Sequence, residues 1–188
     1  EFIVCSERAT LEERLQNLVM EEKDEGYMDD DEIRSTYNLK DNYAWKTEEV
    51  RTKLRDKGIL DEIYKEYHYR LFDFRHTYHS GIVLNRQRGD LVANISENNP
   101  AIALTRQSSG NAPYNHVFIT NRVADLCLIS TSTREGAYLC PLYQDSSGKK
   151  SNISEHVLNS LNAALKRKIK TDEIFYYVYA ILFSTKYR

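Results

Sequence analysis

Near the start of the chain, hydrophobic residues recur every three or four positions, which is the spacing of an amphipathic helix. Residues 11–19 show this pattern behind Thr10, which we expect to be the N-cap. The acidic run 29–32 predicts the start of a second helix, because negative charge stabilises a helix N-terminus. A third helix follows and is expected to end near Gly58. We therefore predict a mostly helical, acidic segment over residues 1–63.

From residue 64 the pattern changes to short apolar runs separated by polar, turn-forming clusters. Short runs with this spacing are typical of antiparallel strands. We expect strands around 67–74 and in the apolar runs at 101–104, 117–119, 126–129 and 138–143. Helical spacing returns after residue 150, in two helices that begin near Ser154 and Thr171.

The order of these patterns predicts the fold class. We expect an α+β fold in which an antiparallel β-rich module over 64–150 is flanked by the helical segment 1–63 and by the C-terminal helices of 151–188. The length of 188 residues suits one such domain with helical additions.

The formal net charge of −2 conceals an uneven distribution. Residues 1–60 contain 16 acidic and 10 basic side chains, a balance of −6, whereas residues 61–188 contain 12 acidic and 16 basic, a balance of +4. Between 65 and 170 the counts are 14 basic and 8 acidic, a balance of +6. A basic body behind an acidic front favours a polyanionic partner for the body, although an ordinary solvated surface explains the charges equally well.

The cysteines and the hydropathy of the chain indicate the cellular compartment in which the protein is expected. The cysteines at 5, 127 and 140 form no Cys-x-x-Cys pair, so we expect neither a zinc knuckle nor a redox motif. Cys127 and Cys140 lie in apolar runs and are predicted to be buried free thiols. Without a signal peptide or an apolar stretch of membrane-spanning length, a cytoplasmic protein with no membrane contact is expected. The abrupt start on Glu1 indicates a fragment of a longer chain.

One pair of segments carries candidate chemistry. Arg106 and Gln107 follow the apolar run 101–104, and Asn115 and His116 precede the next run. Arg is shaped to bind guanine with two hydrogen bonds, and Gln to bind adenine in the same way. The segments therefore suggest contacts to DNA bases, a weak signal on its own because many loops contain Arg-Gln.

The order of several segments along nearly the whole chain resembles one known family. The chain is similar to the C-terminal target recognition region of single-chain restriction–modification enzymes of type ISP and of related adenine-specific DNA methyltransferases. The similar stretches are residues 2–4, 30–34, 37–41, 45–46, 69–78, 105–107, 115–118, 141–143 and 172–182. Leu71 departs from the family pattern, which usually has proline there, and residues 79–98 match least well.

The resemblance implies a function without chemistry for this chain. In such enzymes this region selects the sequence of double-stranded DNA. An N6-adenine methyltransferase domain that uses S-adenosylmethionine precedes it in the same polypeptide. The resemblance leaves open whether an ATP- and Mg-dependent translocase and a nuclease lie further upstream in the parent. No cofactor is expected for this chain itself. Asn98-Asn99-Pro100-Ala101 lacks the second proline and the aromatic residue of the methyltransferase catalytic signature.

We expect no catalytic residue and no metal site. His76 and His79 are three residues apart, but the stretch is predicted to be extended, where this spacing does not suit ligation. The hypothesis for DNA ranks Arg106 and Gln107 first for contacts to base edges and Asn115, His116 and Arg134 second. Four basic residues in polar stretches are expected to contact phosphates: Arg86, Arg88, Lys149 and Lys150.

Each assignment has a structural alternative. The alternative for Arg106 is an ion pair with Asp125 or Glu135. Arg70 and Arg75, which flank Asp73, are more typical of a structural ion-pair corner than of DNA contacts. The basic cluster 166–170 either complements a helix C-terminus or follows the DNA backbone. A competing function is a protein-docking module built on the Tyr-rich last helix. A single-stranded RNA binder has less support, because no alternation of aromatic and basic residues typical of sheet-based RNA modules is present.

Overall fold

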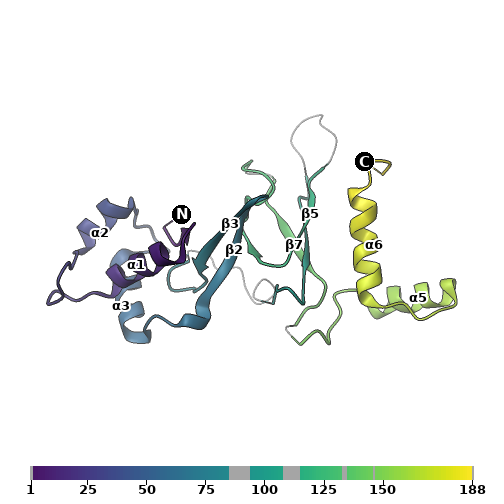
Figure 1. Ribbon diagram of the computed structural model, residues 1–188, viewed down its shortest axis with the longest axis horizontal. Helices are drawn as coiled ribbons and strands as arrows, with labels where there is room; N and C mark the ends of the chain where they lie inside the picture. Colours follow the sequence, from purple (N-terminus) through teal and green to yellow (C-terminus); the bar gives the residue numbers. More distant parts are fainter. Residues whose placement is uncertain (1, 85–93, 108–114, 133–134, 146, 188) are drawn as a thin grey trace. The chain divides into compact units, whose positions relative to one another are not determined.

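The computed structural model describes residues 2–84, 94–107, 115–132, 135–145 and 147–187. The α+β class predicted from the sequence is confirmed, with helices towards both ends of the chain and small sheets between them (Figure 1). In chain order the elements are β1 (Val4–Cys5), α1 (Arg8–Val19), α2 (Asp30–Tyr37), α3 (Thr47–Lys57), a 3-10 turn (Asp61–Ile63), β2 (Tyr64–Arg70), β3 (Asp73–Tyr78), β4 (Ala101–Leu104), β5 (Val117–Thr120), β6 (Val123–Ala124), β7 (Tyr138–Pro141), α5 (Glu155–Leu165) and α6 (Thr171–Phe183).

The chain divides into two compact units. The first unit comprises residues 1–67 and 74–87, and the second comprises residues 68–73 and 88–188. One sheet has the strand order β1-β3-β2-β6, and the other, wholly antiparallel, has the order β5-β4-β7. The expected functional boundaries at 63/64 and 150/151 stay a prediction.

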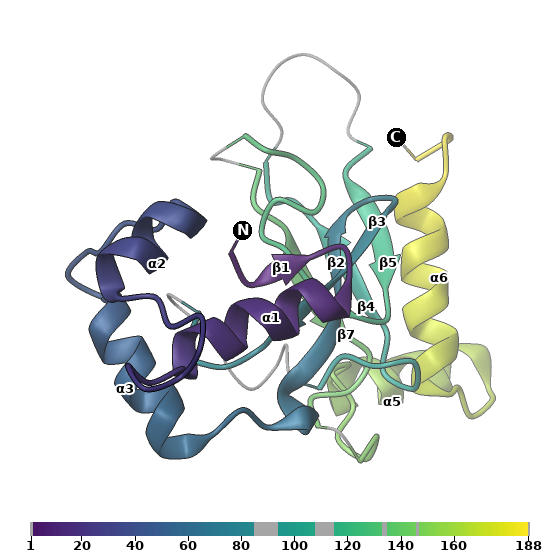
Figure 2. The same cartoon turned by 60° about the vertical axis from the view of Figure 1, so that its left-hand side comes forward.

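The core of the first unit is formed by three helices and β1. Helix α1 buries Leu11, Leu15 and Leu18 completely, and α3 contributes Val50 and Leu54. Helix α1 lies along β1, as Figure 2 shows. The apolar spacing in the sequence thus identified the buried faces of these helices, because a helix that packs on one side must bury every third or fourth residue.

The helix boundaries agree with the sequence in most places. Asp29 caps α2, because its carboxylate accepts hydrogen bonds from the backbone N–H groups of Asp31 and Glu32. Gly58 ends α3 with a φ of 75°, a conformation that favours glycine. The expected cap at Thr10 was wrong: α1 begins at Arg8, with Glu7 as the N-cap residue. Arg8 binds Glu12 one turn later, and this ion pair supports the additional first turn.

A buried arginine connects the three helices of the first unit. Arg51 on α3 is 2% exposed, and its guanidinium donates to the carbonyl oxygens of Leu18 and Met20 at the C-terminus of α1. The same group pairs with Asp30 in the first turn of α2 at 2.8 Å. Because the carbonyls at a helix C-terminus lack partners within the helix, a cation is favourable there.

The three-stranded sheet of the second unit has a different cover on each face. Ile102 and Val117 face α6, where they pack against Phe175. Both Figure 1 and Figure 2 show α6 running alongside β5. The opposite face presents Ala103, which packs against Leu128 and other residues of the segment between β6 and β7. The alternation along β4 is the one expected for a strand buried on both faces.

The apolar run 126–129 is not a strand, contrary to the prediction. The backbone turns here: Leu128 N donates to Asp125 O, and the Asp125 carboxylate accepts from Cys127 N at 2.7 Å. An aspartate that binds the backbone two residues later stabilises a turn. The run is apolar because Leu128 is buried under the sheet, which packing alone explains. The prediction of buried thiols was also wrong, since Cys127 is half-buried and Cys140 is exposed.

The bend between β2 and β3 is fixed by polar contacts within the second unit. Leu71 and Phe72 connect the strands, so the bend precedes Asp73, the first residue of β3. Arg70 pairs with Asp125 at 3.0 Å, and its guanidinium lies 3.9 Å from the Tyr69 ring centroid. Arg70 therefore forms a structural ion pair with Asp125, whereas the expected corner of Arg70 and Arg75 around Asp73 stays a prediction.

Replacement of the buried arginine should destabilise the protein. Arg51→Met leaves Asp30 and the Leu18 carbonyl without their arginine donor, and we expect the free energy of unfolding to fall by about 3 kcal/mol, the low end for a buried pair because Asp30 remains partly solvated. Arg55→Met is the matched control, because Arg55 binds the same Met20 carbonyl from an exposed position. Its loss should stay below about 1 kcal/mol in urea denaturation. Equal losses in both variants would contradict the role given to Arg51.

Candidate nucleic-acid interface

The pairing of β4 with β5 brings the two polar segments to one end of the sheet. Leu104 lies opposite Val117, and one step further Thr105 N donates to His116 O at 3.3 Å. Arg106 and Gln107 therefore leave β4 at the same sheet end where Asn115 and His116 enter β5. Arg106, Gln107 and Asn115 are exposed, and His116 is half-buried. Four of the predicted base-contacting residues thus lie together at this end, which we call the β4–β5 end.

Tyr138 of β7 contacts the side chain of Arg106. The guanidinium carbon of Arg106 lies 4.2 Å from the ring centroid of Tyr138, which is opposite Leu104. Such a contact contributes about 0.5–1 kcal/mol at an exposed site. In the described part of the chain Arg106 forms no ion pair, and Asp125, one of its expected alternative partners, binds Arg70. The contact between the Tyr138 ring and the flat face of the guanidinium group therefore restrains the orientation of the Arg106 N–H donors.

Sequence reasoning missed Tyr138. It is the first residue of the apolar run 138–143 and was assigned to the strand rather than to the site. Only the register of β7 against β4, with Leu104 opposite Tyr138, shows that it approaches Arg106. The only signal in the sequence was that an aromatic residue begins a predicted strand.

The pKa of the Cys140 thiol is influenced by the positive charge of Arg106 at the β4–β5 end. Cys140 follows Tyr138 by two residues on β7, so both side chains leave the same face of the strand. Cys140 is exposed as a residue, but partial desolvation of its thiol still raises the pKa, and the positive charge of Arg106 acts in the opposite direction. The thiol is therefore within electrostatic reach of the guanidinium group.

Lys149 and Lys150 lie at the opposite end of the same sheet. Pro141, the last residue of β7, is opposite Ala101, and the turn with both lysines follows from there. Asp145 shapes this turn: its carboxylate accepts from Lys150 N at 2.6 Å, and the Ser147 hydroxyl and nearby backbone N–H groups lower its pKa. Both lysines are exposed. The structure thus separates the expected base contacts from two expected phosphate contacts.

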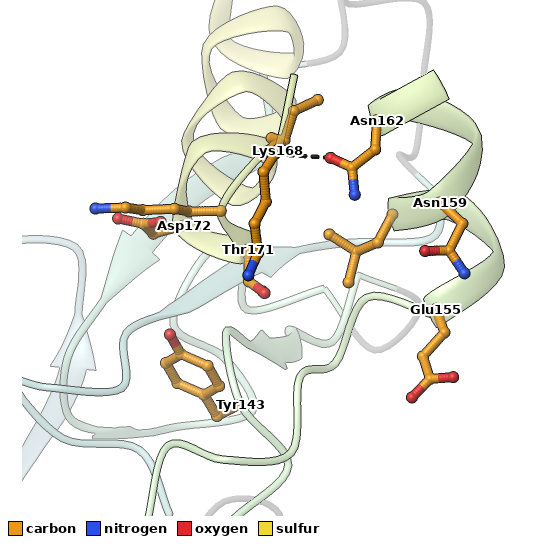
Figure 3. A pocket seen from close by; sticks show the side chains of 10 residues that line it. Tyr143, Glu155, Asn159, Asn162, Lys168, Thr171 and Asp172 are labelled. Atoms are coloured by element: carbon orange, nitrogen blue, oxygen red, sulfur yellow. Dashed lines mark hydrogen bonds between the residues drawn. The ribbon is translucent and has the colours of Figure 1, made fainter. Parts of the chain in front are cut away.

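A cleft of about 830 Å³ adjoins this turn and includes Lys168 in its lining. Figure 3 shows the Lys168 side chain beside Thr171, with Tyr143 and Asn159 around the same space. Tyr143 is linked to the lysine turn through its bridge to Ser151. Elsewhere in the basic cluster, Arg167 pairs with Glu173 at 2.8 Å. The cluster therefore serves in part to join α5 to α6.

Asn99, part of the Asn98–Ala101 stretch, is a structural residue. Its side chain is 3% exposed, donates to the backbone oxygens of Asn94 and Tyr143, and accepts from Tyr143 N. These three bonds use most of its hydrogen-bonding capacity and fix the segment before β4 against the segment after β7.

Two further observations concern the described residues alone. No group of three or more His, Cys, Asp or Glu side chains in them is placed to hold a metal ion. None of their helices has the length and apolar character needed to cross a bilayer. Three predicted contacts, Arg86, Arg88 and Arg134, lie outside the described residues.

Comparison with known proteins identifies relatives of the whole chain. The family described as the type ISP C-terminal specificity domain matches residues 1–188. The fold resembles a part of DrdV, solved by electron cryomicroscopy as a DNA complex, with a TM-score of 0.61 and 19% identity over 96% of this chain. It also resembles a part of LlaBIII, an ATP-dependent type ISP restriction–modification enzyme bound to DNA, with a TM-score of 0.61 and 15% identity over 99% of this chain. The chain spans 18% and 12% of those two chains. No curated protein matches it.

The position of Arg106 can be tested through Cys140. Arg106→Gln removes the charge that lowers the pKa of this thiol, so the thiolate fraction falls and alkylation by iodoacetamide at pH 8 should slow. The rate is measured by peptide mass spectrometry relative to Cys127 in the same molecule. Gln107→Ala, a neutral change one residue away, should leave the ratio unchanged. An unaltered ratio in Arg106→Gln would place the guanidinium away from β7.

Proposed function

Because the chain belongs to the type ISP C-terminal specificity domain family, we propose that it recognises a specific sequence in double-stranded DNA and positions it for an N6-adenine methyltransferase domain upstream in the same polypeptide. The observation that carries the proposal is the gathering of Arg106, Gln107, Asn115 and His116 at the β4–β5 end. The DNA complexes of DrdV and LlaBIII, whose folds are similar, support the choice of ligand.

In this proposal Arg106 and Gln107 contact base edges in the major groove. Arg forms two hydrogen bonds with guanine, Gln forms two with adenine, and each such pair contributes about 1–3 kcal/mol of discrimination. The contact with Tyr138 limits the orientations of Arg106 before DNA arrives, so less conformational entropy is lost on binding. Asn115 and His116 are assigned to neighbouring positions of the same site.

The lysines at the other end of the sheet suit the phosphate backbone. Four paired residues separate the two ends, which corresponds to about 13 Å along a strand. The major groove is about 12 Å wide. With the β4–β5 end against the bases, Lys149 and Lys150 come within reach of the phosphates that border the groove. We assign Arg86, Arg88 and Arg134 to DNA as well, on sequence grounds.

We propose that this chain performs no chemistry itself. Methylation of a base requires its extrusion from the helix into a catalytic pocket, a step we assign to the upstream domain with S-adenosylmethionine. ATP and Mg would serve a translocase in the parent. The buried Asn99 supports this assignment, because its side chain is hydrogen-bonded to the backbone rather than directed to a ligand.

A second function, docking to another part of the parent protein, has separate support. Helix α6 exposes Tyr177 to 67% and Phe183 to 47%, and α5 exposes Leu165 to 56%. Apolar side chains gathered on neighbouring helices are typical of protein interfaces. The two functions are compatible, since the exposed helix faces and the β4–β5 end are different surfaces.

Variants at the β4–β5 end should change the recognised sequence. In the full-length parent, Arg106→Ala and Gln107→Ala should each cost about 1–3 kcal/mol of discrimination and make one position of the methylated motif degenerate. The measurement is a map of N6-methyladenine across a methylation-free bacterial genome that expresses each variant. Lys40→Ala, an exposed change in the first unit, is the control and should leave the motif intact. An unchanged motif in both test variants would remove these residues from base recognition.

Variants in the lysine turn should act on affinity without altering the motif. Lys149→Ala and Lys150→Ala should each reduce the slope of log affinity against log salt concentration by about 0.9, the value for one lost phosphate contact. Fluorescence anisotropy with a labelled duplex at several salt concentrations gives the slope. Lys57→Ala, at the exposed end of α3, should leave it unchanged. A slope unaltered by either turn variant would exclude phosphate contacts there.

A further inference from the structure

A cleft in the first unit combines positive charge with hydroxyl groups. It has a volume of about 690 Å³ and is walled by β1, the first turns of α1, the end of α2 and Arg75 of β3. Two arginines, Arg14 and Arg75, contribute to its lining. The described lining contains no Asp or Glu, although residues 1–60 hold 16 acidic and only 10 basic side chains. A cleft that is lined by two guanidinium groups and by no acidic side chain favours an anionic ligand.

Arg14 is held in position without a carboxylate. Its Nη1 donates to the backbone oxygen of Phe2 at 2.7 Å, and its guanidinium carbon lies 5.8 Å from the Tyr37 ring centroid. Tyr37 is fixed in turn, because its hydroxyl accepts from Asn17 Nδ2 at 2.6 Å. Among the described residues Arg14 forms no ion pair. Most of its five N–H donors therefore remain available to a ligand.

Arg75 approaches the same cleft from the neighbouring strand. The register of β1 and β3 places Cys5 opposite His76, so Arg75 lies one step further along, beside Ser6. Both guanidinium charges act on the Cys5 thiol: burial raises its pKa, and Arg14 and then Arg75 lower it. The two positive charges are therefore close to one point of the cleft.

We propose that this cleft binds a phosphate group of the DNA backbone, with Arg14 and Arg75 as its cationic donors and the hydroxyl of Thr10 beside them. Arg matches phosphate through paired N–H···O bonds. The nearby C-terminus of α2 carries about half a negative charge, which two full positive charges outweigh. The inference rests on the proposed function, and it extends the DNA contact from the second unit to the first.

The experiment measures the salt dependence of duplex binding by the wild-type chain, Arg14→Gln and Arg75→Gln. Each variant should lower the slope of log affinity against log salt concentration by about 0.9 and leave the sequence preference unchanged. Arg34→Gln is the matched control, because Arg34 lies in the same unit but does not line the cleft. Thermal unfolding of all variants checks the fold, and Arg75→Gln keeps the test valid if loss of the Phe2 contact destabilises Arg14→Gln.

The outcomes separate this inference from the function on which it rests. Salt-dependent wild-type binding with unchanged slopes in both arginine variants would overturn the inference and leave the proposed function standing. Absence of wild-type binding would overturn both. Titration with inorganic phosphate, followed through the NMR amide resonance of Thr10, identifies the source of the anion. If phosphate shifts this resonance in the wild-type chain but not in Arg14→Gln, and the DNA slopes are unchanged, the cleft would be assigned to free phosphate. Competition by polyglutamate but not by DNA would assign it to an acidic protein segment.

Discussion

The antiparallel pairing of β4 with β5 is the constraint on which the candidate interface depends. With Leu104 opposite Val117, the segments that follow one strand and precede the other must meet at one sheet end. A shift of one residue in this pairing would turn one strand over relative to the other, so that either Ile102 or Val117 would face away from Phe175. Burial of apolar side chains under α6 therefore fixes which polar groups reach solvent together. The core sets the geometry of the site, although no core residue belongs to the site.

Polar side chains in the second unit serve two distinct purposes. Asn99, Asp125 and Asp145 bind backbone groups and define where the connecting segments turn. The residues proposed to contact DNA are instead exposed, and their links to the protein are few. This division follows from the free-energy cost of an unsatisfied buried polar group, which makes structural polar residues bind the backbone. A rigid frame then presents flexible side chains in a defined place.

Local signals in the sequence predicted much of the fold. Helix starts at Asp29 and Ser154, the glycine end of α3 and the short strands all depend on neighbouring residues, and the structure agrees with them. The run 126–129 was assigned wrongly because burial under a sheet and membership of a strand produce the same apolar pattern. The candidate residues could be named from side-chain chemistry. Their separation into two sheet ends, and the contact of Tyr138 with Arg106, could not be predicted because strand register depends on residues far apart in the sequence.

The contact of Arg106 with Tyr138 has a consequence for how selectivity responds to the medium. At 4.2 Å the partners are much closer than the screening length of about 8 Å in physiological salt, so their attraction is little affected by ions. Phosphate contacts behave oppositely, because each one loses its gain from counterion release as salt rises. Added salt would then weaken binding to every sequence, while the orientation of the arginine proposed to contact bases persists. The ratio of affinities for correct and incorrect sites would then be set by the base contacts alone and would stay the same as salt rises, while both kinds of complex dissociate more readily.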